Sequence, residues 1–168
     1  MPSHGLKIKP EGGSLLPMTR TPLDPTSLRG RPCSVAAALS VVGDRWSLLI
    51  VRELLFGNGR FSEIARNTGA PRDRLSARLV DLVDSGIVSR SERGYALTAA
   101  GTDLAGVLAA MRAWADHWVV SAPTLAVSHH GHPIDPVVQC RTCGGPVDSP
   151  DVVRQMLVPG WTGQGPIR

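Results

Sequence analysis

Residues 61–86 read FSEIARNTGAPRDRLSARLVDLVDSG, and this segment contains two helical patterns separated by a short break. Apolar side chains recur every three or four residues over about 61–68 and again after Pro71, which is the period of an amphipathic helix. Gly69 lies in the break, and Pro71 suits the first position of a helix because its missing N–H needs no partner there. Two helices joined by so short a turn are typical of a helix-turn-helix motif.

Two further helical patterns precede this motif. The first covers about 32–43, where Pro32 suits a helix start and Gly43 a helix end. The second covers about 44–56 and carries apolar residues on two sides. A helix that is apolar on both sides is expected in the centre of a domain.

A change of period follows the motif. Short strand-like runs at 87–91 and 95–97 flank a turn that contains Gly94, which predicts a β-hairpin. Thr98 then caps a last helix that ends near Trp118. The order of elements predicts a mainly α fold with a small β-hairpin wing, the arrangement of a winged helix-turn-helix.

The distribution of Gly and Pro predicts how the 168 residues are divided. Residues 1–31 hold nine of them, residues 32–120 hold ten, and residues 121–168 hold thirteen. Segments that are as rich in Gly and Pro as the first and the last disfavour a packed hydrophobic core. We therefore expect a flexible arm over 1–31, one packed domain over 32–120 that contains the helix-turn-helix, and a Gly/Pro-rich tail over 121–168.

Several classes of protein are disfavoured by composition. No apolar run reaches the roughly 18 residues of a membrane span, and no secretory signal is apparent, so we expect no membrane association. Three cysteines, an odd number without framework spacing, favour a reducing, cytoplasmic location. The net charge of +4 permits nucleic-acid binding, and 16 of the 18 basic residues are Arg, which suits phosphate and guanine contacts. A GC-rich genome would explain the same bias.

The second helix of the motif, at about 71–85, has the features of a recognition helix. Its leucines form one face, so the opposite face is free to enter the major groove of double-stranded DNA. Arginines on that face and on the hairpin could contact guanine edges or phosphates. The alternative is an ordinary solvated helix face. The predicted DNA-binding residues are Arg72, Arg74, Ser76, Ala77 and Arg78 on the helix, with Arg90 and Arg93 on the wing.

Several longer motifs occur in a specific order. They are VGDRWSLLIVREL (42–54), GRFSEI (59–64), LSARLVDL (75–82), GIV (86–88) and YALTAAG (95–101). Over about 33–118 the chain resembles the HxlR family of bacterial winged helix-turn-helix regulators. The resemblance implies a cytosolic transcription factor, usually a repressor, whose terminal helices form a homodimer. Two features depart from the family pattern: the wing turn at 91–94 is shorter, and Ala70-Pro71 replaces the Ile-Ser that often opens the recognition helix.

The last helix carries an apolar seam with spacings of four and three residues. Such a seam suits packing against another helix, either from its own domain or from a second subunit. Two of its tryptophans, together with Trp46, would alternatively line an effector pocket or belong to the core. The predicted dimer residues are Leu104, Leu108, Met111, Trp114, Ala115 and Trp118.

The cysteines raise two further hypotheses. Cys33 lies at the start of the first helix, where the helix dipole lowers the pKa of a thiol and favours the reactive thiolate. The family resemblance implies that a cysteine at this place senses oxidants. The alternative is a buried, inert thiol. In the tail, Cys140 and Cys143 form a CxxC that, with His130 and His132, would hold a structural zinc ion. A zinc ion shared between the CxxC pairs of two subunits, a redox pair and an unliganded loop are the alternatives.

No enzyme motif accompanies these features. The chain has no nucleotide-binding glycine loop, no nucleophile elbow and no paired carboxylates, so we do not expect an enzyme. The leading hypothesis is a sequence-specific DNA-binding regulator that responds to a small-molecule or oxidant effector. The rivals are a winged-helix protein-interaction module without operator specificity, and a redox-responsive regulator switched through Cys33 or the CxxC.

Overall fold

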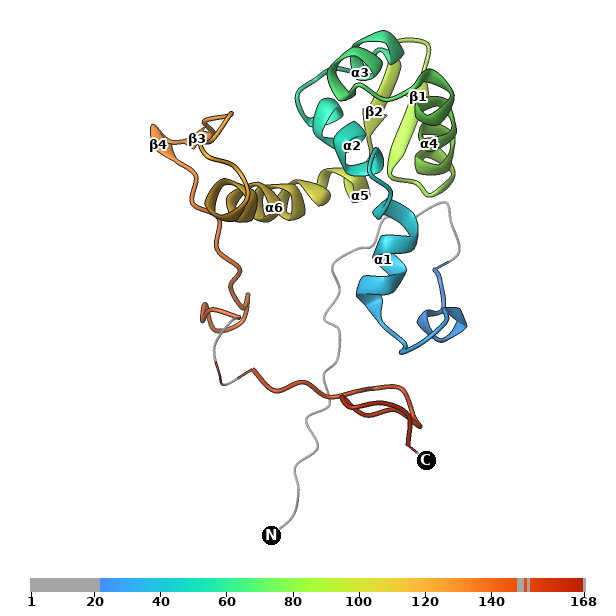
Figure 1. Cartoon of the computed structure of the whole chain (residues 1–168), viewed down its shortest axis with the longest axis vertical. Coiled ribbons are helices and arrows are strands. Elements are labelled where there is room, and N and C mark those ends of the chain that lie inside the picture. Colours follow the sequence, from blue (N-terminus) through green and yellow to red (C-terminus); the bar gives the residue numbers. More distant parts are fainter. Residues whose placement is uncertain (1–21, 148–149, 151, 168) are drawn as a thin grey trace.

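The computed structural model describes residues 22–147, 150 and 152–167 (Figure 1). A short 3-10 turn, η1 (Pro25–Ser27), precedes the helices, and a two-stranded wing separates the helix-turn-helix from the last two helices. The elements in order are α1 (Ser34–Val42), α2 (Ser47–Leu55), α3 (Phe61–Thr68), α4 (Arg72–Asp84), β1 (Val88–Ser91), β2 (Gly94–Leu97), α5 (Ala99–Thr102), α6 (Leu104–Trp118), β3 (Ser128–His129) and β4 (His132–Pro133). The mainly α fold with a hairpin wing is confirmed.

The hydrophobic core lies among α2, α3, α4 and β1. Ile50 and Val51 of α2 are fully buried, which confirms that this helix occupies the centre of the domain. The leucines of α4 pack against them from one side and Ile64 of α3 from another. Because these apolar side chains come from all three helices, burying them fixes α3 and α4 relative to α2. The core residues with almost no exposure are Ile50, Val51, Ile64, Leu75, Leu79, Leu82 and Val88.

The wing is an antiparallel pair in which Val88 lies opposite Leu97 and Arg90 opposite Tyr95. The Tyr95 backbone N–H also donates to the Gly59 carbonyl at 2.9 Å, so the loop between α2 and α3 pairs with the outer edge of β2. Gly94 adopts a φ of +121°, and a side chain there would meet the Gly59 carbonyl oxygen. The hairpin is therefore held by the domain along one edge and is not a free flap.

Two predicted helix boundaries are wrong. The helix expected from residue 44 begins at Ser47, because the Asp44 carboxylate accepts a hydrogen bond from the Trp46 backbone N–H at 2.8 Å and forms a turn instead. The last predicted helix is divided at Asp103 into α5 and α6. Thr98 caps α5 as expected, since its hydroxyl accepts from the Gly101 N–H at 3.2 Å. The small β3–β4 pair in the tail was not predicted.

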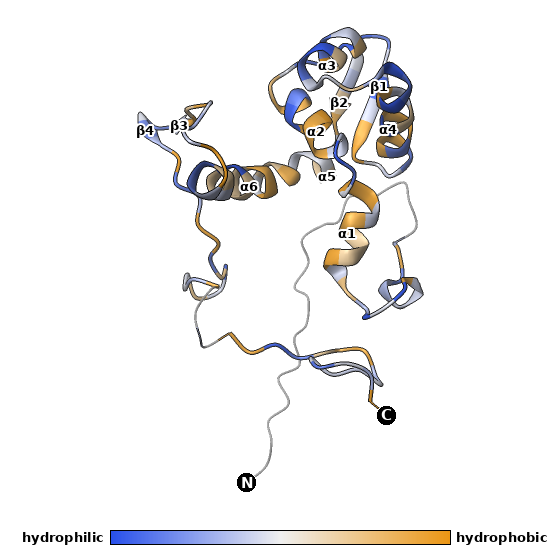
Figure 2. Ribbon diagram, in the orientation of Figure 1, coloured by the Kyte–Doolittle hydropathy of each residue, from blue (hydrophilic) through white to orange (hydrophobic). Residues whose placement is uncertain are grey.

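Helix α1 is apolar along most of its length and only partly covered (Figure 2). Val42 is buried against the core, whereas Val35 and Leu39 are exposed. Among the residues that the structure describes, no single helix is long and apolar enough to cross a membrane; α1 and α2 reach that length and composition only as a pair bent by 76°.

Helix α6 extends away from the helix-turn-helix (Figure 1). Leu104 and Leu108, near its start, pack against the core of the same domain. Met111, Trp114 and Trp118, further along the same seam, are exposed. The first part of the predicted seam thus anchors the helix, and its second part has no partner among the described residues.

Gly101 marks the closest approach between α5 and the wing. A Cβ at this position would lie 2.2 Å from the Ile87 carbonyl oxygen, so Gly101→Ala must push α5 away from β1. We expect this substitution to lower the free energy of unfolding by about 1–3 kcal/mol. Gly106→Ala in α6 is the matched control, because an added Cβ meets no atom within 4 Å. Thermal unfolding followed by circular dichroism checks both, and equal stability of the two variants would contradict the expectation.

Candidate nucleic-acid interface

The turn between α3 and α4 is built from local hydrogen bonds. Gly69 adopts a left-handed conformation with φ +69°, and its N–H donates to the Ala65 carbonyl at 3.0 Å, which ends α3. The Thr68 hydroxyl donates to the Ile64 carbonyl at 2.7 Å and accepts from the Ala70 N–H at 3.2 Å. These bonds set the direction in which the chain enters α4. Pro71 lies just before the first residue of α4, not within it, and provides no side-chain cap.

Helix α4 has a buried face and an exposed face. Leu75, Leu79 and Leu82 pack into the core, so the residues between them point outward. Arg72 and Arg74 lie in the first turn of the exposed face. The structure therefore places both guanidinium groups near the amino end of the helix, where the helix dipole also favours an anionic partner.

The two arginines have few competing partners. The Arg74 side chain is 74% exposed and reaches Asp73 only at 3.9 Å, a contact that water screens strongly. The Arg72 guanidinium lies 5.8 Å from the centre of the Phe61 ring, a cation–π contact that orients it beside α3. Both groups remain available to bind phosphate or guanine.

Arg78 lies in a different environment from the other two arginines. Its guanidinium is 3.0 Å from the Asp81 carboxylate, and the side chain is only 35% exposed. Both residues line a hollow of about 390 Å³ between α4 and α1, which also includes Ser40 and Val41. Ser76 and Ala77 are exposed on the outer face of α4. We infer that Arg78 contributes less to DNA contact than Arg72 and Arg74, although its predicted role is untested.

Both predicted wing arginines are exposed. Arg90 lies across the hairpin from Tyr95, with its guanidinium 5.7 Å from the ring centre. Arg93 lies in the two-residue turn between β1 and β2. The turn is short, as the sequence indicates, and of the two arginines it contains Arg93 alone, whereas Arg90 lies on β1. Their contact with DNA stays a prediction.

A buried carboxylate behind the motif was not predicted from sequence. Glu53 of α2 is 3% exposed. One of its carboxylate oxygens, Oε1, accepts hydrogen bonds from Arg52 Nε and Nη2 at 2.9 and 2.7 Å. The other, Oε2, accepts from the side-chain amides of Asn58 and Asn67 at 2.8 and 2.9 Å. Glu53 thus connects α2 to the loop before α3 and to the last turn of α3.

The bonds at Glu53 also set its charge state. Burial by itself raises the pKa of this carboxyl, but hydrogen bonds from Asn67, Arg52 and Asn58, with the nearby Arg52 charge, outweigh burial and lower the pKa. The sequence offers one signal for such a site, a lone acidic residue within the apolar run of α2. That signal does not identify the partners, because Asn67 is fourteen residues away.

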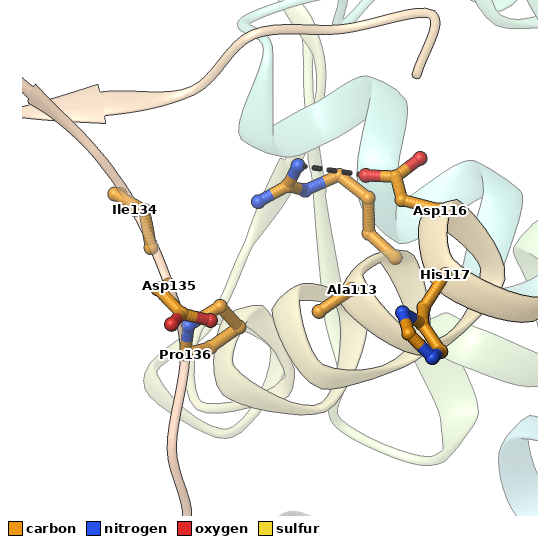
Figure 3. A pocket seen from close by; sticks show the side chains of 7 residues that line it. Ala113, Asp116, His117, Ile134, Asp135 and Pro136 are labelled. Atoms are coloured by element: carbon orange, nitrogen blue, oxygen red, sulfur yellow. Dashed lines mark hydrogen bonds and ion pairs between the residues drawn. The ribbon is translucent and has the colours of Figure 1, made fainter. Parts of the chain in front are cut away.

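The three tryptophans named as candidates for an effector pocket lie in different environments. Trp46 packs against the core, whereas Trp114 and Trp118 are exposed. A hollow of about 290 Å³ lies between α6 and the tail, and Figure 3 shows its lining side chains. An ion pair of 3.0 Å between Arg112 and Asp116 forms part of its wall. The lining residues are Arg112, Ala113, Asp116, His117, Ile134, Asp135 and Pro136.

The cysteines predicted to carry redox or metal chemistry lie in separate places. Cys33 is half-buried immediately before α1, and its reactivity stays a prediction. Cys140 and Cys143 share one loop of the tail, whereas His130 and His132 belong to the β3–β4 hairpin. The described part of the chain contains no group of three or more His, Cys, Asp or Glu side chains arranged to hold a metal ion. The four residues predicted as one zinc site are therefore not brought together within this chain.

Comparisons with known proteins agree with the geometry. Residues 41–123 match the family described as HxlR-like helix-turn-helix. The HTH-type transcriptional regulator Rv3095 of Mycobacterium tuberculosis is 38% identical over 130 residues, covering 71% of this chain and 82% of that protein. The HTH-type transcriptional regulator YodB of Bacillus subtilis is 34% identical over 97 residues, covering 53% of this chain and 87% of YodB.

The fold has a counterpart among solved structures. The crystal structure of PA1607, described as a candidate transcription factor, matches with a TM-score of 0.62 at 33% identity. The match covers 73% of this chain and 94% of PA1607.

Proposed function

The chain belongs to the HxlR-like helix-turn-helix family of DNA-binding transcriptional regulators, and we propose that it is a repressor that recognises a specific operator as a homodimer. Members of this family are regulators and not enzymes. In the proposed complex α4 lies in the major groove and the β1–β2 wing lies against the adjacent backbone.

The observation that carries this proposal is the disposition of α4. Its leucine face is buried, and its first turn presents Arg72 and Arg74 outward with little competition from acidic groups. A guanidinium can donate two parallel hydrogen bonds to a guanine edge, which distinguishes one base pair from another. The same groups can bind phosphates without distinguishing sequences, so sequence preference is the property to measure.

The exposed part of α6 supports the homodimer. Trp114 and Trp118 are 62% and 71% exposed, and Met111 lies on the same seam. Single exposed apolar residues are ordinary, but a row of large ones along one helix marks an interaction surface. The exposed Val35 and Leu39 of α1 offer a second apolar surface on the same chain. A two-fold dimer would present two copies of α4 to two half-sites of a palindrome.

The direct test is selection of DNA fragments from the genome of the source organism by the full-length chain. We expect enrichment of a palindrome-like site, bound more tightly than unrelated duplex at each of two salt concentrations. Affinity should fall with added salt, because phosphate contacts release counterions. Binding without an enriched site would overturn operator recognition and favour the protein-interaction alternative.

Trp114→Ala tests the dimer surface. Large aromatic side chains at the centre of an interface carry much of its free energy, so we expect the dimer dissociation constant to rise at least tenfold. Val80→Ala serves as the control, since Val80 is exposed on α4, away from α6. Analytical ultracentrifugation over a dilution series measures both variants. A Trp114→Ala chain that dimerises like the wild type would show that α6 is not the interface.

A further inference from the structure

The CxxC of the tail lies in a loop that backbone hydrogen bonds close. The Gly144 N–H donates to the Cys140 carbonyl at 2.7 Å, and the Cys140 N–H donates to the Gly145 carbonyl at 2.8 Å. Gln139 and Pro146 pair on either side of the loop in an isolated antiparallel bridge. Gly144 adopts a φ of +71°, which turns the chain back directly after Cys143. This cysteine loop (139–146) is therefore closed by its own backbone hydrogen bonds.

The loop also leaves both of its thiols at least partly exposed. Both cysteines are free thiols, Cys143 is exposed and Cys140 is half-buried. Two cysteines separated by two residues in such a closed turn form the arrangement by which a zinc knuckle binds its metal ion.

Among the residues that the structure describes, the site is incomplete. A structural zinc ion takes four ligands in a tetrahedron, and the described residues place no third His, Cys, Asp or Glu side chain beside the two thiols. The β3–β4 hairpin, which carries the histidines, lies apart from the cysteine loop (Figure 1). The His132 Nδ1 atom is already 3.0 Å from the Pro133 carbonyl oxygen. The described residues therefore supply two of the four ligands that a structural zinc ion takes.

We propose that Cys140 and Cys143 form half of a zinc site that the same two cysteines of a second copy complete, giving one ion bound by four cysteines per dimer. This inference rests on the homodimer proposed above and extends it to the tail. Each Zn–S bond replaces an S–H bond, so binding one ion releases up to four protons and changes no oxidation state.

The surface around the loop supports a second copy as the source of the missing ligands. Val137 and Val138, which lead into the loop, are 70% and 63% exposed, and Val147 is exposed just after it. Two loops facing one another across a metal ion would cover these apolar side chains. A zinc ion with four thiolates carries a net charge of −2, and Arg141 within each loop supplies a positive charge next to it.

Native mass spectrometry of the full-length chain, purified without a histidine tag and with zinc present, tests the proposal. We expect the mass of a dimer plus one zinc ion, which is about one-half equivalent of zinc per chain. Replacement of zinc by Co²⁺ should give the strong sulfur-to-metal charge-transfer absorption of a tetrahedral four-thiolate site. Cys140→Ser with Cys143→Ser should abolish metal binding, whereas Cys33→Ser and the pair His130→Ala with His132→Ala should retain it.

The remaining outcomes separate this proposal from the proposed function. A dimer that binds its operator but no metal overturns the shared site alone, as does a dimer with a Cys140–Cys143 disulfide. One zinc ion per chain that is lost from the His130→Ala, His132→Ala variant would assign the site to a single chain. A monomer at all concentrations overturns the dimer and the shared site together, and operator selection then decides separately whether DNA recognition remains.

Discussion

Replacing Glu53 with alanine is expected to lower the free energy of unfolding by about 2–4 kcal/mol. The substitution removes the acceptor of four hydrogen bonds and leaves the Asn58 and Asn67 amides without that partner. A hydrogen bond to a charged carboxylate is worth about 1.5–3 kcal/mol, and part of this is recovered because Asn58 is half-buried and Asn67 is exposed, so both amides can turn to water. Arg52 contributes less, because its side chain is 37% exposed and can turn to water. Since Glu53 connects α2 to the loop before α3 and to the last turn of α3, the loss should also loosen the helix-turn-helix.

Chemical denaturation of the wild type and the variant measures the effect. Glu92→Ala is the control, because Glu92 is an exposed glutamate in the wing turn. We expect that change to alter the unfolding free energy by less than about 0.5 kcal/mol. Equal stability of the two variants would show that the buried network does not stabilise the fold.

The same residue predicts a dependence of stability on pH. The folded-state pKa of Glu53 is lower than its ordinary value, so the folded state binds fewer protons than the unfolded state as the carboxyl titrates. Its contribution is fully present above the ordinary glutamate pKa and is lost as pH falls through the lower folded-state value. Glu53→Gln removes the titrating group, so its stability should fall less steeply over that acidic range. Identical pH profiles of the two proteins would contradict this assignment.

Removing Arg72 and Arg74 together should weaken operator binding by about 2–6 kcal/mol, roughly 30-fold or more. A guanidinium that contacts guanine in two places contributes about 1–3 kcal/mol of discrimination, and two such residues in the same helical turn can act together. If either residue contacts phosphate instead, non-specific binding weakens equally and the salt dependence becomes shallower. Fluorescence anisotropy with operator and scrambled duplex at two salt concentrations distinguishes these roles.

A matched variant controls for the loss of positive charge. Arg45→Ala with Arg154→Ala removes two exposed arginines outside the helix-turn-helix, and we expect a much smaller change in operator affinity. Arg78→Ala should also have a smaller effect than the double variant, because Arg78 is paired with Asp81 beside α1. Unchanged operator binding by the Arg72→Ala, Arg74→Ala chain would mean that α4 is not the recognition helix.

Local patterns predicted most of the domain. The periods of three and four residues located α3 and α4, and the change of period located the wing between Gly86 and Thr98. Boundaries were less predictable where a side chain competes with the helix, as the Asp44 carboxylate does before α2. The break at Asp103 was also missed, because apolar spacing continues across it.

The tail shows a different limit of sequence reasoning. The CxxC spacing alone indicated a metal-binding loop and allowed its partners to be histidines of the same chain or cysteines of another. Backbone hydrogen bonds around Cys140 show that the loop is closed, and the position of the β3–β4 hairpin separates the histidines from it. The spacing of residues along the chain carried no information on that separation.

The sequence by itself determined the order of elements, the buried leucine face of α4 and the family, because these depend on residues close together in the chain. Only the tertiary structure decided which polar groups meet across distant segments. It placed Glu53 beside Asn67, left Arg72 and Arg74 free, and turned Arg78 toward α1. Such contacts depend on how α1, α2 and α4 pack, and helical periodicity identifies which face of a helix is buried but not which side chain lies opposite it.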